Sequence, residues 1–410
     1  MTILSSVLPY LVNPHYTLPL PVPQFQNSPC IDPPVPVEKK CPVRRRYPEN
    51  FVKNYSSGET TNRSFFRGGR FVKLQRYSGN PILSPHPEHH WENLAVFNPA
   101  AWYDREKKQV LLLYRAAEDH PEYKCCFGLA TSKDGYRFQR TSDRPVLSPS
   151  VEGFDGATIQ DPRMVKIDDW YYVTYAARPY PFGQFWLPKE QQYRPPPRPG
   201  EFPCFLRQNA TLTGLALTRD FKTWIRAGAL TDPLLDDRDV VLFPEKINGQ
   251  FVMIHRPLEW VGPAYGADQA CAWISFADDL LGFRQSKRLI KNRFPWEKRK
   301  LGVNTPPVKT PHGWLTLYHA VGDDLYYRLG ALLLDLDDPS KVLYRSRDWL
   351  MQPETDYEIE GFYRGVCFPC GKVVIEGTLF VYYGAADKYC ALATCPLADL
   401  LDYLLTCPVE

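Results

Sequence analysis

Residues 97–104 read FNPAAWYD, and the pattern of one or two apolar residues followed by proline recurs four times further along the chain. The later copies are QDPRMVKI from Gln160, LFPEKING from Leu242, TPPVKTPHG from Thr305 and CFPCGKVV from Cys367. Their prolines, at positions 99, 162, 244, 306 and 369, lie 63, 82, 62 and 63 residues apart. A nearly constant spacing of this length is typical of a repeat architecture.

Each copy is followed by an aromatic, β-forming run and then by a further short apolar run. The aromatic runs are VLLLYRAA from Val110, YYVTYAAR from Tyr171, FVMIHRPL from Phe251, WLTLYHAV from Trp314 and LFVYYGAAD from Leu379. About four short strands per unit, in five units, predict an all-β five-bladed β-propeller over residues 71–410. The alternative is an irregular β-sandwich, but a sandwich has no reason to repeat five times.

Two segments fall outside the repeat. Residues 1–70 are rich in proline and show no strand or helix period, so we interpret them as an arm that lies over the body or reaches a neighbouring subunit in a homo-oligomer. The long step between prolines contains the proline-rich insertion 179–208. We expect this insertion to lie at the channel mouth, where it would shape the outer part of a binding site.

The composition indicates a globular protein that works on a small or uncharged substrate. Hydrophobic residues make up 44% of the 410 positions, and the net charge of +3 gives no footprint for nucleic acid or an acidic membrane. No signal peptide or transmembrane run is evident, and the 11 cysteines form no disulfide framework, so a cytoplasmic location is expected. We interpret Cys367 and Cys370 as buried strand residues, and predict no metal or cofactor.

The repeat predicts which side chains converge on the central channel. At the first-strand position the units offer Asn98, Asp161, Phe243 with Glu245 and Lys246, Thr305 and Phe368; at the ends of the aromatic runs they offer Arg115, Arg178, His255 with Arg256, His319 and Asp387. Asp161 and Asp387 are the carboxylates that stand out, and the channel is rich in cations: Arg238, Lys246, Arg256 and His319. One carboxyl group can protonate a glycosidic oxygen, and cations can hold a phosphate nucleophile.

Several long segments also match a known family in order. The segments FNPAA, DPRMVKIDDWYYVTY, RDVVLFPEKINGQFVMIHRP, PPVKTPHGWLTLYHAV, YRLGALLLDLDDPSKVLYRS and FPCGKVVIEGTLFVYYGAAD resemble glycoside hydrolase family 130, the β-mannoside phosphorylases and related β-mannosidases. The resemblance covers residues 74–404. It implies a five-bladed propeller and an inverting reaction on a non-reducing-end β-mannosyl unit.

The resemblance also implies residue roles. Asp161 corresponds to the general acid, thought to donate its proton through the mannosyl 3-hydroxyl. Arg238, Lys246, His319 and Tyr327 match phosphate-handling positions, while Asn98, Arg115 and Asp387 match positions that hold the mannosyl unit; Arg256 is predicted to contact the substrate.

Three functions are compatible with these residues. The first is a phosphorylase that converts a β-mannoside oligosaccharide and phosphate into α-mannose 1-phosphate. The second is an inverting β-mannosidase that uses water, with Glu245 or Glu259 as base. The third is a propeller that only binds glycan, because propellers host many functions.

Overall fold

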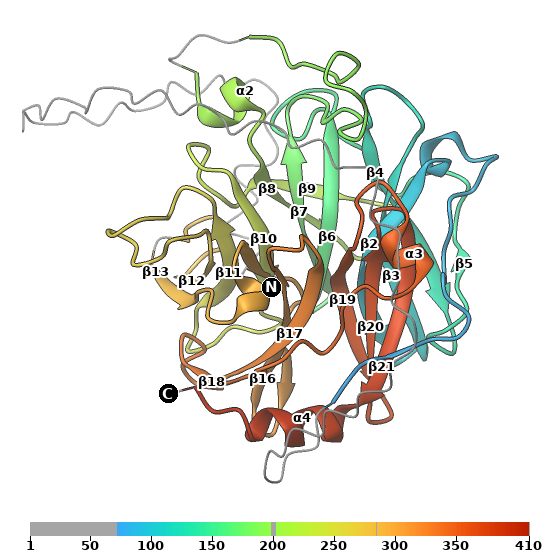
Figure 1. Cartoon of the computed structure of the whole chain (residues 1–410). Helices are drawn as coiled ribbons and strands as arrows, with labels where there is room; N and C mark the ends of the chain where they lie inside the picture. The colour runs from blue at the N-terminus through green and yellow to red at the C-terminus, as the bar shows by residue number, and fades with distance from the viewer. Residues whose placement is uncertain (1–71, 198–201, 284, 410) are drawn as a thin grey trace, which may run out of the picture. The chain divides into compact units, whose positions relative to one another are not determined.

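The computed structural model describes residues 72–197, 202–283 and 285–409, so the predicted arm over residues 1–70 lies outside the described residues. The described chain forms five small antiparallel sheets arranged in a ring, as Figure 1 shows. The prediction of a five-bladed β-propeller is therefore confirmed. We number the sheets as blades 1 to 5 in the order in which their innermost strands follow along the chain.

The first three blades each have four strands in chain order. Blade 1 contains β2 (Ala95–Asp104), β3 (Gln109–Ala117), β4 (Cys125–Ser132) and β5 (Gln139–Arg140). Blade 2 contains β6 (Thr158–Ile167), β7 (Trp170–Arg178), β8 (Leu212–Thr218) and β9 (Ile225–Ala229). Blade 3 contains β10 (Asp237–Leu242), β11 (Phe251–Pro257), β12 (Ala272–Ala277) and β13 (Gln285–Ile290).

The last two blades depart from this plan. In blade 4 the innermost strand is split into β14 (Lys300–Val303) and β15 (Val308–Thr310), which pair with β16 (Gly313–Val321), followed by β17 (Tyr327–Leu334) and β18 (Val342–Arg345). Blade 5 contains β19 (Cys367–Ile375), β20 (Thr378–Ala385), β21 (Tyr389–Pro396) and, outermost, β1 (Gln75–Arg76). The ring is thus closed by pairing the first described strand with the last.

In the part of the chain that the structure describes, five short helical segments connect or cover the blades. They are η2 (His90–Glu92), α2 (Cys204–Gln208), η3 (Pro295–Glu297), α3 (Asp356–Ile359) and α4 (Leu397–Leu405). Helix α2 lies in the insertion between β7 and β8, and α4 follows the last strand. Within the described ranges, no helix is long and apolar enough to cross a membrane.

The hydrophobic cores lie between neighbouring blades. Leu111 and Leu113 of blade 1, for example, pack in one cluster with Ile159 and Val173 of blade 2. Because each blade is covered on both faces, its middle strands are apolar at nearly every position, as the buried run of β16 illustrates. Polar side chains buried within these strands are hydrogen-bonded; Thr174 and Thr316, for example, donate to backbone carbonyls.

β-Bulges interrupt the innermost strands of blades 1, 2 and 3 opposite the same position of the second strand. The register of pairing shifts between Phe97 and Ala100, between Gln160 and Arg163, and between Arg238 and Val241. The bulge residues Asn98, Asp161 and Asp239 have φ values of 48°, 50° and 56°. Asn and Asp tolerate this left-handed conformation better than other residues with a Cβ atom, and a bulge re-aims its side chain.

Buried carboxylates tie each blade to its neighbouring segments. In four blades a tyrosine of the second strand donates to a buried carboxylate that also binds an arginine: Tyr114–Glu92–Arg140, Tyr175–Asp155–Arg226, Tyr318–Glu297–Arg345 and Tyr383–Glu358–Arg76. Blade 3 has His255 at the equivalent place, with Nδ1 2.7 Å from Asp237. In each of the four tyrosine networks the buried carboxylate has both a hydroxyl donor and an arginine. The network stabilises the fold only while all of its members are present, because a lone buried charge is costly.

Removing one partner of such a network is expected to cost more than removing an exposed pair. Glu297 is 0% exposed and accepts from Arg345 at 2.6 Å and Tyr318 at 2.8 Å. We expect Arg345→Met to lower the free energy of unfolding by about 3 to 5 kcal/mol, since it leaves a buried charge unpaired, and Tyr318→Phe by about 1 to 2 kcal/mol. Urea unfolding of both variants measures this.

The matched control is Lys298→Met, which breaks the exposed pair between Lys298 and Asp323. Its effect should stay within about 0.5 kcal/mol, because solvent screens such pairs. If Arg345→Met is no more damaging than Lys298→Met, the network does not stabilise the blade.

Candidate active site

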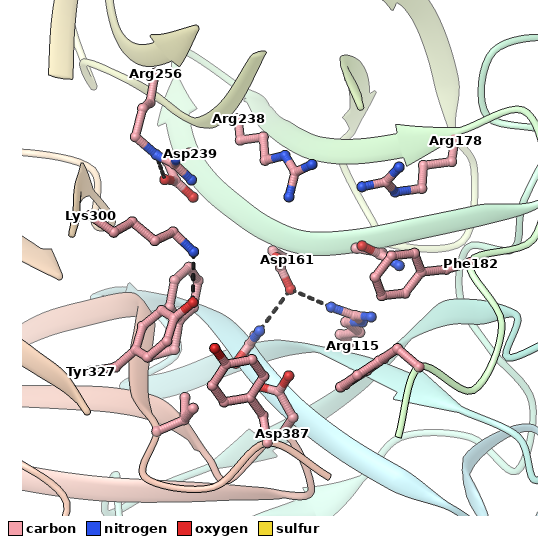
Figure 2. A pocket seen from close by; sticks show the side chains of 16 residues that line it. Arg115, Asp161, Arg178, Phe182, Arg238, Asp239, Arg256, Lys300, Tyr327 and Asp387 are labelled. Carbon is pink, nitrogen blue, oxygen red and sulfur yellow. Dashed lines mark hydrogen bonds and ion pairs between the residues drawn. The ribbon is translucent and has the colours of Figure 1, made fainter. Parts of the chain in front are cut away.

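All five blades contribute side chains to one cavity of about 270 Å³. Its lining, drawn in Figure 2, is Asn98, Arg115, Gln160, Asp161, Arg178, Phe182, Phe185, Arg238, Asp239, Arg256, Lys300, Tyr327, Tyr363, Val366, Phe368 and Asp387. Five of these side chains are cationic and three are carboxylates. A cavity with convergent charged groups is the expected form of a ligand site.

The structure brings together most of the site residues predicted from the sequence. Seven of the nine line the cavity: Asn98, Arg115, Asp161, Arg238, Arg256, Tyr327 and Asp387. His319 lies directly behind the wall, fully buried, with its ring 5.5 Å from the ring of Tyr327 and 4.9 Å from that of Phe368. Lys246 is not brought to the cavity. It is exposed after β10, and its ammonium group lies 4.3 Å from the ring of Phe251.

The position of Lys246 outside the cavity shows that the repeat was misaligned in blade 3. The proline pattern aligned Pro244 with the prolines that follow Asn98 and Asp161, but the structure has the equivalent bulge at Asp239, which is followed by valine. Pro244 comes after the end of β10, beyond the channel. Glu245, one of the proposed bases, is exposed there with Lys246 and pairs with Lys309 at 2.6 Å.

Asp161 is a cavity carboxylate held by donors from two blades. Its Oδ1 accepts from Asn98 Nδ2 at 2.7 Å and from Arg115 Nη1 at 2.9 Å. Its own carbonyl accepts from Arg163 Nη1 at 2.9 Å, which pins the bulge from behind. Burial by itself would raise the pKa of Asp161, but the charges of Arg115 and Arg163 and the two donors outweigh it and lower the pKa below the usual value.

Asp387 is another cavity carboxylate, and its pKa is shifted upward, opposite to that of Asp161. It follows β20 with a φ of 55°, which turns the chain at the end of the strand. Burial raises its pKa to about 6; the nearby charge of Asp161 adds to the shift, while Arg115 and Lys300 oppose it. Because the two pKa values are moved apart, Asp387 can be protonated while Asp161 is ionised at pH values below about 6.

A cluster of cations occupies the side of the cavity formed by blades 3 and 4. Arg256 Nε donates to Asp239 at 2.6 Å, and Arg238 Nη2 donates to Asp236 at 2.7 Å. Lys300 Nζ donates to the Tyr327 hydroxyl at 2.7 Å. Burial lowers the pKa of Lys300 to about 7, helped by the positive charges of Arg256 and Arg238. Concentrated positive charge of this kind suits an anionic ligand.

His319 supports this cationic side from behind. Its Nδ1 and its backbone N–H both lie against Asn304 Oδ1, so Nδ1 carries the proton and donates. Burial lowers the pKa of His319 well below its usual value, and Lys300 and Arg256 add to this effect. The neutral ring therefore presents Nε2 as an acceptor, and this buried atom has no hydrogen-bond partner among the described residues.

Three charged residues of the cavity lining were missed or left without a role by sequence reasoning. Asp239 and Lys300 were not singled out, and Arg178 was placed at the channel without a function. The strand-pairing register identifies Asp239 and Lys300 as cavity residues. Asp239 occupies the bulge of blade 3, and Lys300 pairs with Val321, two residues beyond His319. The prolines alone do not carry this register.

Two further expectations bear on the site. Glu259 accepts the backbone N–H of Asp236 at 3.0 Å and does not line the cavity. No group of three His, Cys, Asp or Glu side chains that could hold a metal ion occurs within residues 72–197, 202–283 and 285–409.

The raised pKa of Asp387 predicts a pH-dependent stability. A group whose pKa is higher in the folded chain than its ordinary value of 3.8 contributes stability that is present below pH 3.8 and is lost as the pH rises through about 6. Relative to Asp387→Asn, the wild type should lose up to about 3 kcal/mol of unfolding free energy between pH 4 and pH 7. Denaturant unfolding across this range checks it, and a constant difference between the proteins would contradict it.

Comparisons with known proteins agree with the geometry. The family model of glycoside hydrolase family 130, described as beta-1,4-mannooligosaccharide phosphorylase, matches residues 73–183 and 206–406. The chain is 38% identical over 336 residues to the 1,2-beta-oligomannan phosphorylase of Thermoanaerobacter sp. strain X514, covering 80% of this chain and 99% of that protein. A beta-1,2-mannobiose phosphorylase of the same strain is 35% identical over 333 residues, covering 78% and 96%.

A solved structure also has this architecture. The beta-1,2-mannobiose phosphorylase of Listeria innocua, in complex with beta-1,2-mannobiose, superposes with a TM-score of 0.66 at 27% identity, covering 81% of this chain and 99% of that one. The family model covers more than half of the chain and both Thermoanaerobacter relatives exceed 30% identity. The chain belongs to glycoside hydrolase family 130.

Proposed function

We propose that this protein is an inverting β-mannoside phosphorylase that transfers a non-reducing-end mannosyl unit to phosphate and forms α-mannose 1-phosphate. The observation that carries this is the placement of one organised carboxylate, Asp161, beside a cavity side built from Arg238, Arg256 and Lys300. An inverting hydrolase needs a second carboxylate as base, whereas phosphate needs cations. The names of relatives at 35–38% identity point the same way.

The chemistry balances with phosphate as the only co-substrate. A phosphate oxygen attacks the anomeric carbon from the face opposite the leaving sugar, the glycosidic bond breaks, and the leaving oxygen takes a proton delivered by Asp161, directly or through a hydroxyl of the substrate. Monohydrogen phosphate supplies that proton in the net reaction, so Asp161 is returned to its starting state. The dianion also offsets the positive charges of Arg115 and Arg163 that hold the pKa of Asp161 low.

The cavity residues divide into two groups. Arg238, Arg256, Lys300 and Tyr327 are proposed to bind phosphate, with His319 Nε2 accepting a phosphate hydroxyl from behind the wall. Asn98, Arg115 and Asp387 are proposed to hold the mannosyl unit against Asp161. Lys300 replaces Lys246 in this group, because Lys300 lines the cavity and Lys246 does not.

The competing functions have weaker support. Of the two carboxylates considered as a base for hydrolysis, Glu245 pairs with Lys309 and Glu259 caps the backbone of Asp236, both outside the cavity. Asp239 lines the cavity but accepts from Arg256 and Arg163. A propeller that only binds glycan has no need for a carboxyl group whose pKa is set by two hydrogen-bond donors and two neighbouring guanidinium charges.

Substrate and location follow as further parts of the proposal. The relatives at 38% and 35% identity are named for β-1,2-linked mannosides, whereas the family model is described by the β-1,4 linkage. We therefore propose β-1,2-mannobiose as the first substrate to test and β-1,4-mannobiose as the second. Eight cysteines of the described chain are free thiols, which supports the reducing cytoplasm as the place of action.

The acid is tested by Asp161→Asn. Asparagine tolerates the left-handed backbone of this position, so the bulge should persist while the proton donor is lost. We expect turnover of β-1,2-mannobiose with phosphate to fall by about 10³-fold or more, with mannobiose binding retained in calorimetry. Turnover of a 4-nitrophenyl β-mannoside, whose leaving group needs no proton, should fall much less in this variant. Near wild-type turnover of mannobiose would remove Asp161 from the mechanism.

The nucleophile is tested by Arg238→Ala with Lys246→Ala as its control. Arg238→Ala should raise the phosphate requirement by a factor of about 30 to 1000, with little change in affinity for the mannoside, because guanidinium contacts to phosphate are charge-assisted. Lys246→Ala removes a cation outside the cavity and should leave the phosphate KM unchanged. Release of free mannose at one rate with and without phosphate would establish hydrolysis instead.

A further inference from the structure

Arg178 is a cavity guanidinium without a role in the proposed chemistry. It ends β7 and pairs with Thr158, three residues before Asp161 on the neighbouring strand, so it lies nearer the rim than the acid. One of its terminal nitrogens donates to the Asn209 carbonyl, while its Nε is buried and has no hydrogen-bond partner among the described residues. Unlike the four other cations of the lining, Arg178 has neither a carboxylate nor a phenol within hydrogen-bond distance in the described chain.

A row of aromatic rings borders Arg178. Its guanidinium lies 4.9 Å from the centre of the Phe182 ring, which is 37% exposed. The Phe182 and Phe185 rings are 5.6 Å apart, and Phe185 is 6.5 Å from Tyr363. All three rings line the cavity. The two phenylalanines come from the insertion after β7, and Tyr363 comes from the segment before β19. Aromatic rings that line a polar cavity offer a flat apolar surface on which the apolar face of a ligand can pack.

The position of this group relative to the acid matters for the reaction. In Figure 2, Lys300 and Tyr327 lie on one side of Asp161, and Arg178 and Phe182 lie on the other. In an inverting displacement, the nucleophile and the leaving group occupy opposite faces of the anomeric carbon. If phosphate takes the side of Lys300, the leaving sugar must take the side of Arg178.

We infer that Arg178 and the rings of Phe182, Phe185 and Tyr363 form the acceptor subsite, which binds an uncharged hexopyranose. The apolar face of the sugar packs on the rings, and its hydroxyl oxygens accept from the free guanidinium donors. Arg178 is then a specificity-determining residue. This inference rests on the proposed function, because it takes the leaving sugar of phosphorolysis as its ligand. The family model stops at residue 183 and resumes at 206, so Phe185 belongs to a part of this chain that the model does not match.

The reverse reaction separates the two halves of the cavity. With mannose 1-phosphate as donor and mannose as acceptor, Arg178→Ala and Phe182→Ala should each raise the KM for mannose by about 10-fold to 100-fold. The KM for mannose 1-phosphate should stay within about twofold of wild type. Arg207→Ala is the matched control, since Arg207 belongs to the same insertion, donates to the Phe202 carbonyl and lies outside the cavity lining. It should change neither constant.

Two results would overturn the inference. A rise in the KM for mannose 1-phosphate, with that for mannose unchanged, would assign Arg178 to the phosphate side. Unchanged constants in both variants would make it a structural residue.

Calorimetry keeps this inference separate from the proposed function. The wild type should bind β-1,2-mannobiose more tightly than mannose, and Arg178→Ala should abolish the difference. If that difference is lost as expected but no mannose 1-phosphate forms in the wild type, the phosphorylase proposal fails while the sugar subsite stands. If Arg178→Ala keeps the difference, the subsite is wrong whatever the reaction.

Discussion

The site depends on a backbone constraint that three neighbouring blades share. Their innermost strands break the pairing opposite the same position of the second strand, and the extra residue takes a left-handed conformation. A regular strand would alternate its side chains between the two faces of the blade, which are packed mainly with apolar groups. The bulge instead turns Asn98, Asp161 and Asp239 into the channel. The hydrogen bond from Asn98 to Asp161 is possible because two adjacent blades make the same departure.

The charged side chains of the cavity partly neutralise one another, and the remaining charge suits an anionic ligand. When every group is ionised, five cations and three carboxylates line the cavity, which leaves an excess of two positive charges. That excess equals the charge of a phosphate dianion. Burial lowers the pKa of Lys300 and raises that of Asp387, so both are driven toward their neutral forms. Phosphate binding would restore the charge of Lys300, which couples ligand entry to protonation.

The sequence was sufficient to predict the architecture and to predict that Asp161 faces the channel, because both depend on local signals. Apolar runs, turns and the repeated prolines indicate the blades, and the Asp161–Pro162 pair indicates a bulge. Blade 3 shows where this reasoning ends, since its bulge is followed by valine and its proline lies after the strand; Lys246 was therefore selected wrongly. Lys300 and Arg178 depend on pairing register and on the path of the insertion, which are long-range features that no short segment encodes.

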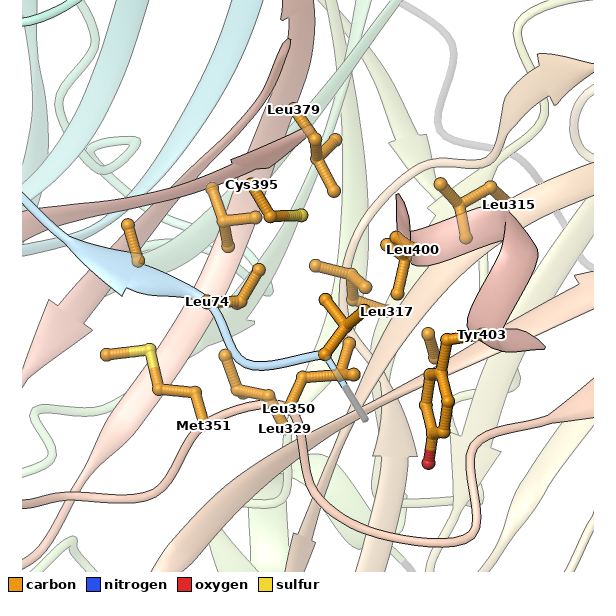
Figure 3. Packing of buried hydrophobic residues seen from close by; sticks show 14 of the residues in the cluster. Leu74, Leu315, Leu317, Leu329, Leu350, Met351, Leu379, Cys395, Leu400 and Tyr403 are labelled. Atoms are coloured by element: carbon orange, nitrogen blue, oxygen red, sulfur yellow. The ribbon is translucent and has the colours of Figure 1, made fainter. Parts of the chain in front are cut away.

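The closure of the ring has a consequence for how the chain is made. Blade 5 takes β1 from the beginning of the described chain and β19 to β21 from its end. Figure 3 shows Leu74, next to β1, packed in the cluster with Leu317, Leu350 and Leu379. During synthesis this N-terminal strand must wait with its apolar neighbour uncovered until nearly all of the chain has left the ribosome. Arg76 has to wait as well, because its partner Glu358 is made 282 residues later. Blades 1 to 4 can form in order, but the channel that they surround becomes a closed ring only as the last step.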